Sequence, residues 1–200
     1  MEKIAINIVL LPDEKMVEEI IEINKELLKF NKNKIILGKE INQPHISLCM
    51  GGVNQLELPE IIEHIDKVSE RFSQFNFQGK LSIQITPDLE KILWLEIEKN
   101  KDIQKIHEVV MEDLFQYLSY NIKNSMLVHP ENVEEKTISW IKEYSNFYRN
   151  PQLFNPHVTI GFGDTVKSDS IYNFASSKLA IFKLGNNCTC TELIYSTNLN

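Results

Sequence analysis

The sequence has few of the residues that mark several common classes of protein. Its 200 residues include only three cysteines, and an odd number without a dense pattern argues against a disulfide framework. The apolar run at residues 4–11 is too short to cross a bilayer and is followed by Pro-Asp-Glu-Lys, which is no cleavage site. We therefore expect a cytoplasmic protein in a reducing compartment, with no membrane partner.

Positive charge is also scarce. The chain carries 21 Lys and Arg against 28 Asp and Glu, a formal net charge of −7, and its only arginines are Arg71 and Arg149. Proteins that coat long nucleic acids usually present a basic surface, so we expect no long duplex partner. A small nucleotide or an RNA end stays open as a partner, and the oligomeric state is not determined.

Motifs for cofactors and metals are missing as well. The sequence contains no glycine-rich nucleotide loop, no His-Glu-x-x-His and no pair of Cys-x-x-Cys, which are the usual signatures of nucleotide cofactors and zinc. The single Cys-x-Cys, Cys188 to Cys190, stands alone. We therefore predict neither a cofactor nor a metal site.

One nine-residue pattern, however, occurs twice. Residues 43–51 read Gln-Pro-His-Ile-Ser-Leu-Cys-Met-Gly, and residues 155–163 read Asn-Pro-His-Val-Thr-Ile-Gly-Phe-Gly. In both copies a proline precedes the histidine, a hydroxyl residue follows two positions later, and a glycine stands six positions after the histidine. From average residue usage, a second chance match has odds of about one in ten thousand or less.

Both copies have the composition of β-strands, in which β-branched residues are enriched. Successive strand side chains point to opposite faces, so His45 shares a face with Ser47, and His157 shares a face with Thr159. The aliphatic faces would pack on helices. A phosphate held between the two strands would meet two hydroxyls and two imidazoles, and imidazole titrates near neutrality, which suits both proton removal and proton donation.

The two motifs, His-Ile-Ser-Leu at 45–48 and His-Val-Thr-Ile at 157–160, resemble the paired His-x-Ser/Thr-hydrophobic motifs of the two-histidine (2H) phosphoesterase superfamily. That group includes bacterial 2′-5′ RNA ligases and 2′,3′-cyclic nucleotide phosphodiesterases. The resemblance implies an α+β fold that is bilobal and duplicated, with two antiparallel sheets facing across a central cleft and helices outside. It implies one 2H phosphoesterase-like domain over residues 1–200.

The resemblance also implies a function, that of a hydrolase. We expect a metal-independent phosphodiesterase that acts on RNA-type 2′,3′-cyclic phosphates or 2′-5′ phosphodiesters. His157 would be the base and His45 the acid, while Ser47 and Thr159 would bind the phosphate. The residues alone do not orient the pair, because the copies are nearly equivalent. Two alternatives stay open: a 2′-5′ RNA ligase, and a non-catalytic protein that binds nucleotides or RNA ends.

The other candidate residues have plainer interpretations. His64 and His107 lie among charges in predicted helices and are expected at the surface, and His129 is expected in a solvated loop. Strand alternation puts Cys49 on the side of His45, where a small filler is a simpler role than a nucleophile.

Three aromatic residues are candidates for stacking on a base in such a cleft. They are Trp94, Phe154 and Phe162, although each also suits a core. Arg149 suits either a phosphate contact or a helix end.

The remaining pattern predicts alternating strands and helices. Asp13 and Asn132 are expected as helix N-caps, Gly51-Gly52 is expected to end the first motif strand, and residues 165–177 read as a polar, turn-rich stretch. The other predicted strands are 4–11, 34–37, 80–86, 91–98, 178–185 and 190–195, and the predicted helices are 13–30, 59–72, 102–120 and 132–148.

Overall fold

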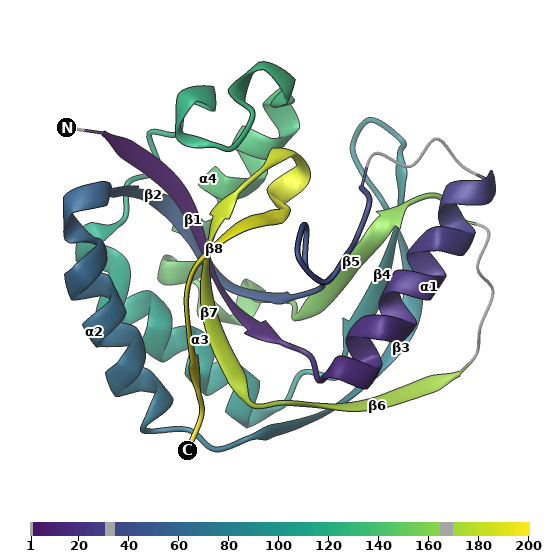
Figure 1. Cartoon of the computed structure of the whole chain (residues 1–200), viewed down its shortest axis with the longest axis horizontal. Helices are drawn as coiled ribbons and strands as arrows, with labels where there is room; N and C mark the ends of the chain where they lie inside the picture. The colour runs from purple at the N-terminus through teal and green to yellow at the C-terminus, as the bar shows by residue number, and fades with distance from the viewer. Residues whose placement is uncertain (1, 31–34, 165–169) are drawn as a thin grey trace.

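Two four-stranded antiparallel sheets form the centre of the protein (Figure 1). The computed structural model describes residues 2–30, 35–164 and 170–200. The strand order is β2-β1-β7-β8 in the first sheet and β5-β4-β3-β6 in the second, which confirms the expected α+β class with two antiparallel sheets. The strands are β1 (Lys3–Leu11), β2 (Ile46–Asn54), β3 (Phe75–Ile85), β4 (Lys91–Ile97), β5 (His157–Phe162), β6 (Ile171–Ser176), β7 (Lys178–Leu184) and β8 (Cys190–Asn198).

The two histidine motifs run along equivalent edge strands. β2 lies at the edge of the first sheet and pairs with β1, whereas β5 lies at the edge of the second sheet and pairs with β4. Along the chain, helical segments separate each motif strand from the strand with which it pairs: α-helix lies between β1 and β2, and also between β4 and β5. The duplication in the sequence is thus a duplication in space, with one motif in each sheet.

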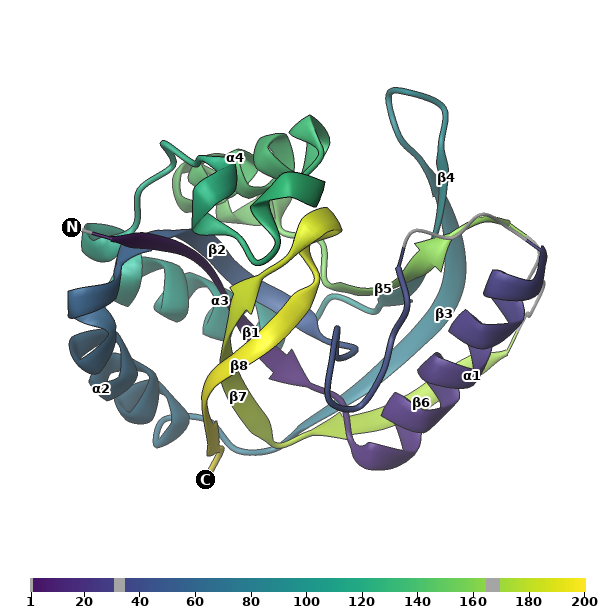
Figure 2. The same ribbon diagram turned by 45° about the horizontal axis from the view of Figure 1, so that its top comes forward.

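Two α-helices, α1 and α3, are exchanged between the two halves (Figures 1 and 2). α1 follows β1 of the first sheet but packs on β5 of the second, and α3 follows β4 of the second sheet but packs on β2 of the first. α2 packs on α3 and β8, and α4 also contacts β2. Each motif strand is therefore supported by a helix from the other half. The helices are α1 (Glu14–Phe30), α2 (Leu58–Ser69), α3 (Lys101–Leu114) and α4 (Glu135–Arg149).

The hydrophobic core lies between these helices and the aliphatic faces of the sheets. Ile46 and Leu48 of β2, and Val158 and Ile160 of β5, are fully buried, as the alternation in the sequence predicted. Burying such a side chain stabilises a fold by about 1.5–3 kcal/mol. The aliphatic face therefore holds each motif strand in place while its polar face stays available.

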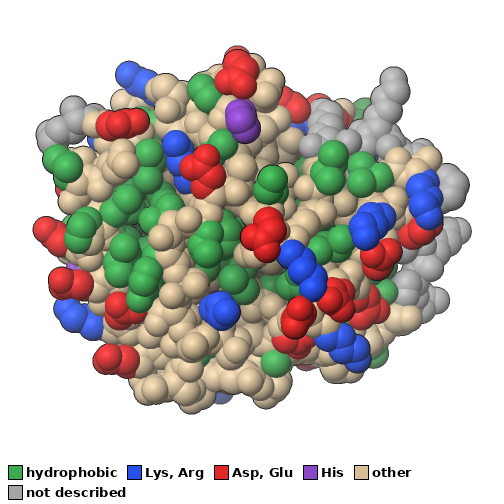
Figure 3. Space-filling model, viewed as in Figure 1, with side chains coloured by type: hydrophobic (Ala, Val, Ile, Leu, Met, Phe, Trp, Pro, Cys, Tyr) green, Lys and Arg blue, Asp and Glu red, His purple; other side chains and the backbone are tan. Residues whose placement is uncertain are grey.

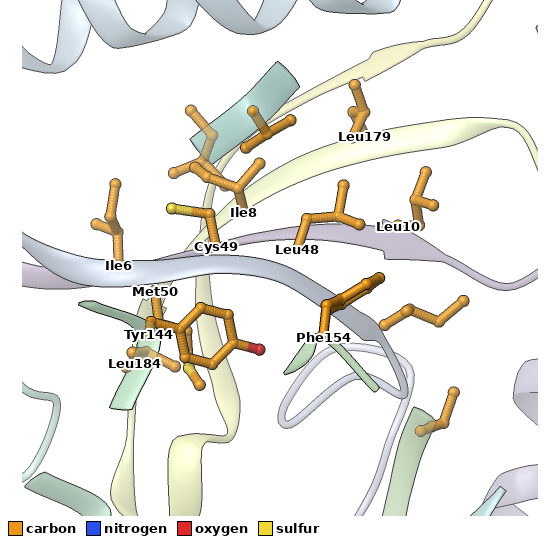
Figure 4. Packing of buried hydrophobic residues seen from close by; sticks show 14 of the residues in the cluster. Ile6, Ile8, Leu10, Leu48, Cys49, Met50, Tyr144, Phe154, Leu179 and Leu184 are labelled. Atoms are coloured by element: carbon orange, nitrogen blue, oxygen red, sulfur yellow. The ribbon is translucent and has the colours of Figure 1, made fainter. Parts of the chain in front are cut away.

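Each motif strand also contains a β-bulge at the same position. The pairing of β2 with β1 skips Leu48, and the pairing of β5 with β4 skips Ile160. Figure 4 shows that Leu48 and Cys49 both project to one side of β2, whereas Met50 projects to the other. A bulge interrupts the regular alternation of side chains. The prediction that Cys49 shares the face of His45 is therefore wrong.

Two adjacent glycines allow close packing instead of ending β2. The strand continues through Gly51 and Gly52 to Asn54, contrary to our prediction. The N–H of Gly52 donates to the carbonyl of Ser119 at 2.9 Å, and the N–H of Ser119 donates back at 2.8 Å. A Cβ at Gly51 would lie 2.8 Å from the side chain of Leu118. The missing side chains thus let a distant segment pack directly on the strand.

The start of α4 differs from the expected one because a distant residue caps it. Asn132 is not the N-cap; it lies in a 3₁₀ turn, and the residue before α4 is Glu134. The N–H of Glu134 donates to Oδ1 of Asn186 at 3.0 Å, and the hydroxyl of Thr137 donates to the same oxygen at 2.7 Å. Asp13, in contrast, caps α1 as predicted, since its Oδ1 accepts from the N–H of Met16 at 2.9 Å.

Other predicted elements also differ from the observed ones; for example, β3 begins at Phe75 and not at residue 80, and α2 ends at Ser69 and not at residue 72. Residues 35–37 form no strand, and Lys34 lies outside the described residues. The polar stretch 165–177 contains β6, an edge strand paired with β3, while 165–169 lie outside the described residues. The third helix ends at Leu114 and continues only as a 3₁₀ turn.

Charged side chains of both signs are mixed on the face shown in Figure 3, most densely over α1. Lys25 pairs with Glu22, and Lys39 pairs with Glu18, both at 2.6 Å. Exposed pairs of this kind usually contribute about 0–1 kcal/mol. Among the residues that the structure describes, no helix is both long and apolar enough to cross a membrane.

Candidate active site

A cavity between the two motif strands brings the predicted site residues together. It has a volume of about 240 Å³ and is lined from both sheets, from α4 and from the turn between β7 and β8. His45, Ser47, His157 and Thr159 all line it. Strand alternation therefore correctly predicted that His45 shares a face with Ser47 and His157 with Thr159, and these two faces meet across the cavity.

Both imidazoles are held by the same local hydrogen bond. Nδ1 of His45 lies 2.7 Å from the carbonyl oxygen of Gln43, and Nδ1 of His157 lies 2.8 Å from that of Asn155. A carbonyl oxygen only accepts, so each Nδ1 must carry the hydrogen. In the neutral ring Nε2 is then the basic nitrogen. The intervening proline, with its fixed φ, helps to set this geometry in both copies.

The surroundings lower the pKa of both imidazoles. Burial lowers the pKa of His157 to about 4, against a raising effect of the hydrogen bond to Asn155, and the nearby His45 lowers it further. Burial also lowers the pKa of His45, opposed by its hydrogen bond to Gln43. Two neighbouring imidazoles resist being charged together. In the favoured states of the pair, therefore, at most one of the two imidazoles is protonated.

The hydroxyl of Ser47 is oriented by residues behind it. Nδ2 of Asn7, a fully buried residue of β1, donates to Oγ of Ser47 at 2.8 Å. Tyr144 of α4 also lines the cavity and forms a hydrogen bond with Ser47, while burial raises the pKa of the tyrosine. Since Oγ accepts from Asn7, its own hydrogen is left for Tyr144 or for a bound ligand.

Aromatic rings form one wall of the cavity. The rings of Trp94 and His157 are stacked with centroids 3.6 Å apart and planes 11° apart. Phe162 and Trp140 line the same cavity. Phe154, the third predicted candidate, is buried in the core outside the cavity lining. Two of the three expected aromatics, Trp94 and Phe162, thus line the cavity.

The sequence matches the family model of the 2′-5′ RNA ligase superfamily over residues 39–192. This match covers more than half of the chain and includes both motifs. The chain belongs to the 2′-5′ RNA ligase superfamily. A search of curated proteins finds no match.

Solved structures with the same fold agree with this superfamily assignment. TT0787 of Thermus thermophilus has a TM-score of 0.63 at 12% identity, with 98% of each chain covered. E. coli LigT complexed with 3′-AMP has a TM-score of 0.57 at 11% identity, covering 100% of this chain and 99% of that chain. A protein described as a phosphoesterase has a TM-score of 0.56 at 12% identity, with the same coverage. At such identities the likeness shows the shared fold.

Several other residues of this superfamily member lie away from the cavity. His129 is exposed in a loop, as predicted, and Arg149 is exposed and does not line the cavity. His64 is partly buried and lies 3.3 Å from the hydroxyl of Tyr117. Cys49 is fully buried, and this burial raises its thiol pKa, so the structure gives no support to a nucleophilic thiolate there.

Ligand groups for a metal are sparse around the cavity. Across the described ranges 2–30, 35–164 and 170–200, no cluster of three or more His, Cys, Asp and Glu side chains has a geometry that could hold a metal ion. Beside the two histidines, Glu143 and Cys188 line the cavity. Burial raises the pKa of the Cys188 thiol to about 12.

Two buried polar residues were missed from the sequence. His107 is fully buried, so its predicted surface position is wrong, and Asn24 is fully buried as well. Both fall within the inward apolar stripe of a helix, since His107 stands four residues after Ile103 and Asn24 stands four residues after Ile20. Residues four apart share a helix face. This spacing was the signal that could have identified both.

Proposed function

We propose that this protein is a metal-independent phosphoesterase that acts on RNA-type 2′,3′-cyclic phosphates or 2′-5′ phosphodiesters. One observation carries the proposal: two imidazoles line one cavity, and the same backbone hydrogen bond fixes each Nδ1 and leaves Nε2 for proton transfer. An acid and a base of this kind typically contribute about 10²–10⁴-fold each to a rate.

In the proposed hydrolysis of a cyclic phosphate, His157 acts as the base. Its Nε2 takes a proton from water while the water oxygen forms a bond to phosphorus. The bond from phosphorus to O2′ or O3′ breaks, and protonated His45 donates its Nε2 proton to the leaving oxygen. The product is a nucleoside monophosphate, and exchange with solvent returns both imidazoles to their starting states. Because burial lowers its pKa to about 4, His157 starts the step unprotonated at neutral pH, as a base must.

The phosphate would be bound between the two hydroxyls. Ser47 donates from one strand and Thr159 from the other, and the hydrogen bond from Asn7 holds Ser47 ready for this contact. A charge-assisted hydrogen bond to an anion is shorter and stronger than a neutral one. The two hydroxyls thus hold the phosphorus between the acid and the base.

The base of the nucleotide would stack on the aromatic wall. Trp140 and Phe162 lie on the cavity lining together with Trp94, and stacking on an aromatic side chain contributes about 1–3 kcal/mol per base. Every base has such a face, so this wall supports binding of nucleotides without selecting a particular base.

A substrate panel tests the proposal. The purified protein would be offered 2′,3′-cyclic mononucleotides, 2′-5′ and 3′-5′ diadenylates and a 3′-5′ DNA dinucleotide, before and after dialysis against a chelator. We expect turnover of the cyclic or the 2′-5′ substrates, unchanged by the chelator. Preference for the DNA dinucleotide, or activity that is lost with chelator and restored by zinc or manganese, would overturn the proposal.

A second candidate function is 2′-5′ RNA ligation, which the description of the matching family favours. Here the 5′-hydroxyl of one RNA end would take the place of water and attack the cyclic phosphate of another, the bond from phosphorus to O3′ would break, and His157 and His45 would keep their roles as base and acid. The net charge of −7 favours small substrates over long RNA. Incubation with paired RNA ends distinguishes the two reactions, and binding without turnover of any substrate would indicate a non-catalytic protein.

A further inference from the structure

The carbonyl group of the extra residue in each β-bulge accepts a hydrogen bond from a helix side chain. Nδ1 of His107 on α3 lies 2.7 Å from the carbonyl oxygen of Leu48, and Nδ2 of Asn24 on α1 lies 2.7 Å from that of Ile160. These are the two helices that are exchanged between the halves. The two contacts are therefore equivalent, although one donor is an imidazole and the other an amide.

Both donors are locked by their surroundings. The ring of His107 is stacked on that of Phe154, with centroids 4.0 Å apart and planes 5° apart. Asn24 also donates to the carbonyl of Ile35 at 3.0 Å and accepts from the N–H of Leu37 at 3.1 Å. Because both donors are fully buried, no water can replace them without rearrangement, and the bulge carbonyls are held in one direction.

The bulges decide which side chains complete the cavity. Regular alternation after Ser47 would direct Cys49 toward the cavity, and regular alternation after Thr159 would place Gly161, which has no side chain, at the equivalent position of β5. With the bulge, Met50 and Phe162 line it instead. The bulged residue directly follows the hydroxyl residue in each motif. Any change at the bulge carbonyl is therefore transmitted along planar peptide units to the hydroxyl and the imidazole.

We propose that His107 and Asn24 are positioning residues, which hold the two bulges and thereby keep the imidazole and hydroxyl of each motif at the spacing that the reaction needs. This inference rests on the proposed function. A misplacement of about 1 Å from a change distant from the chemistry can cost about 100-fold in rate. His107 would act on the motif of β2, and Asn24 on that of β5.

Variants that remove one donor test the inference. His107→Phe keeps an aromatic ring and removes the donor. Asn24→Leu keeps a side chain of similar shape and removes the amide, together with its hydrogen bonds to Ile35 and Leu37. We expect each to lower kcat about 10- to 100-fold, with KM changed less than about threefold. His107→Asn places an amide donor near the position of Nδ1, and we expect it to restore kcat to within about threefold of the wild type.

A matched control separates positioning from stability. Val110→Ala opens a cavity at a fully buried site of the same helix, and it should lower the melting temperature with kcat unchanged. If His107→Phe lowered only the melting temperature, as Val110→Ala does, or if His107→Asn failed to restore kcat in a folded protein, the inference would be wrong.

A measurement without substrate separates this inference from the proposed function. NMR titration of the imidazole signals should show a changed His45 titration in His107→Phe and a changed His157 titration in Asn24→Leu. If the wild type turned over no substrate but these titrations changed as stated, the proposed function would fail and the positioning roles would stand. Unchanged titrations in both variants would overturn the positioning roles whatever the activity.

Discussion

The two motif strands, β2 and β5, share one design but differ in what surrounds it. In β2 the better-supported group is the hydroxyl, because Ser47 accepts a hydrogen bond from buried Asn7 and contacts Tyr144. In β5 it is the imidazole, because His157 is stacked on Trp94. Two nearly equal sequence motifs have thus acquired different environments, and this difference is what can assign different chemical roles to them.

Loss of either imidazole is the strongest test of this comparison. We expect His45→Ala and His157→Ala each to lower kcat about 10²–10⁴-fold, and the double variant to lose far less than the product because both groups act in one step. Melting temperatures should stay close to that of the wild type. His129→Ala, a change at an exposed histidine, is the matched control. Turnover near the wild-type level in either single variant would contradict the two-histidine mechanism.

The pH dependence of kcat/KM sharpens the assignment of the two roles. A base must be unprotonated, so activity should rise as pH increases through the pKa of His157, which is about 4. An acid must be protonated, so activity should fall as pH passes the lowered pKa of His45. We expect a bell with its maximum below pH 6.5 and a fall of about tenfold per pH unit outside it. A rate that rises steadily to pH 9 would contradict this.

The two bulge donors differ in that only His107 titrates. Burial lowers its pKa to about 4, so the unfolded chain binds the extra proton more readily. The free energy of unfolding is therefore at its full value above pH 6.5 and falls by about 3 kcal/mol as pH decreases to about 4. Urea unfolding between pH 4 and 7.5 should show a flatter profile for His107→Asn than for the wild type. Identical slopes would show that this imidazole is not the cause.

The hydroxyl pair gives the smallest expected effects and tests the asymmetry directly. Ser47→Ala and Thr159→Val should each lower kcat/KM about tenfold, as expected for one hydrogen bond to an anion. Ser47→Ala should also cost about 1 kcal/mol of stability, because Asn7 loses its acceptor. Equal stabilities of the two variants in thermal unfolding would show that the buried amide does not distinguish the strands.

Helices and strands were predicted best where the spacing of apolar residues and the residue types of a segment indicated the same structure. The aliphatic faces of β2 and β5 were predicted because alternation holds up to the hydroxyl residue of each motif. The same rule failed at Cys49, because a bulge follows directly. β6 was missed because the residues before it in the sequence are polar and the whole stretch 165–177 was read with them, although β6 itself contains Ile171, Tyr172 and Phe174 and pairs with β3 along the sheet edge.

The sequence by itself determined the duplicated motif, the faces that carry His45, Ser47, His157 and Thr159, and the family to which the chain belongs. These depend on residue type and on short spacings, which the chain displays directly. Only the tertiary structure decided which helix supports which strand, where the bulges lie and that His107 and Asn24 hold them. Those features arise from contacts between residues far apart in the chain. Packing of the helices exchanged between the two halves, rather than local preference, therefore decides them.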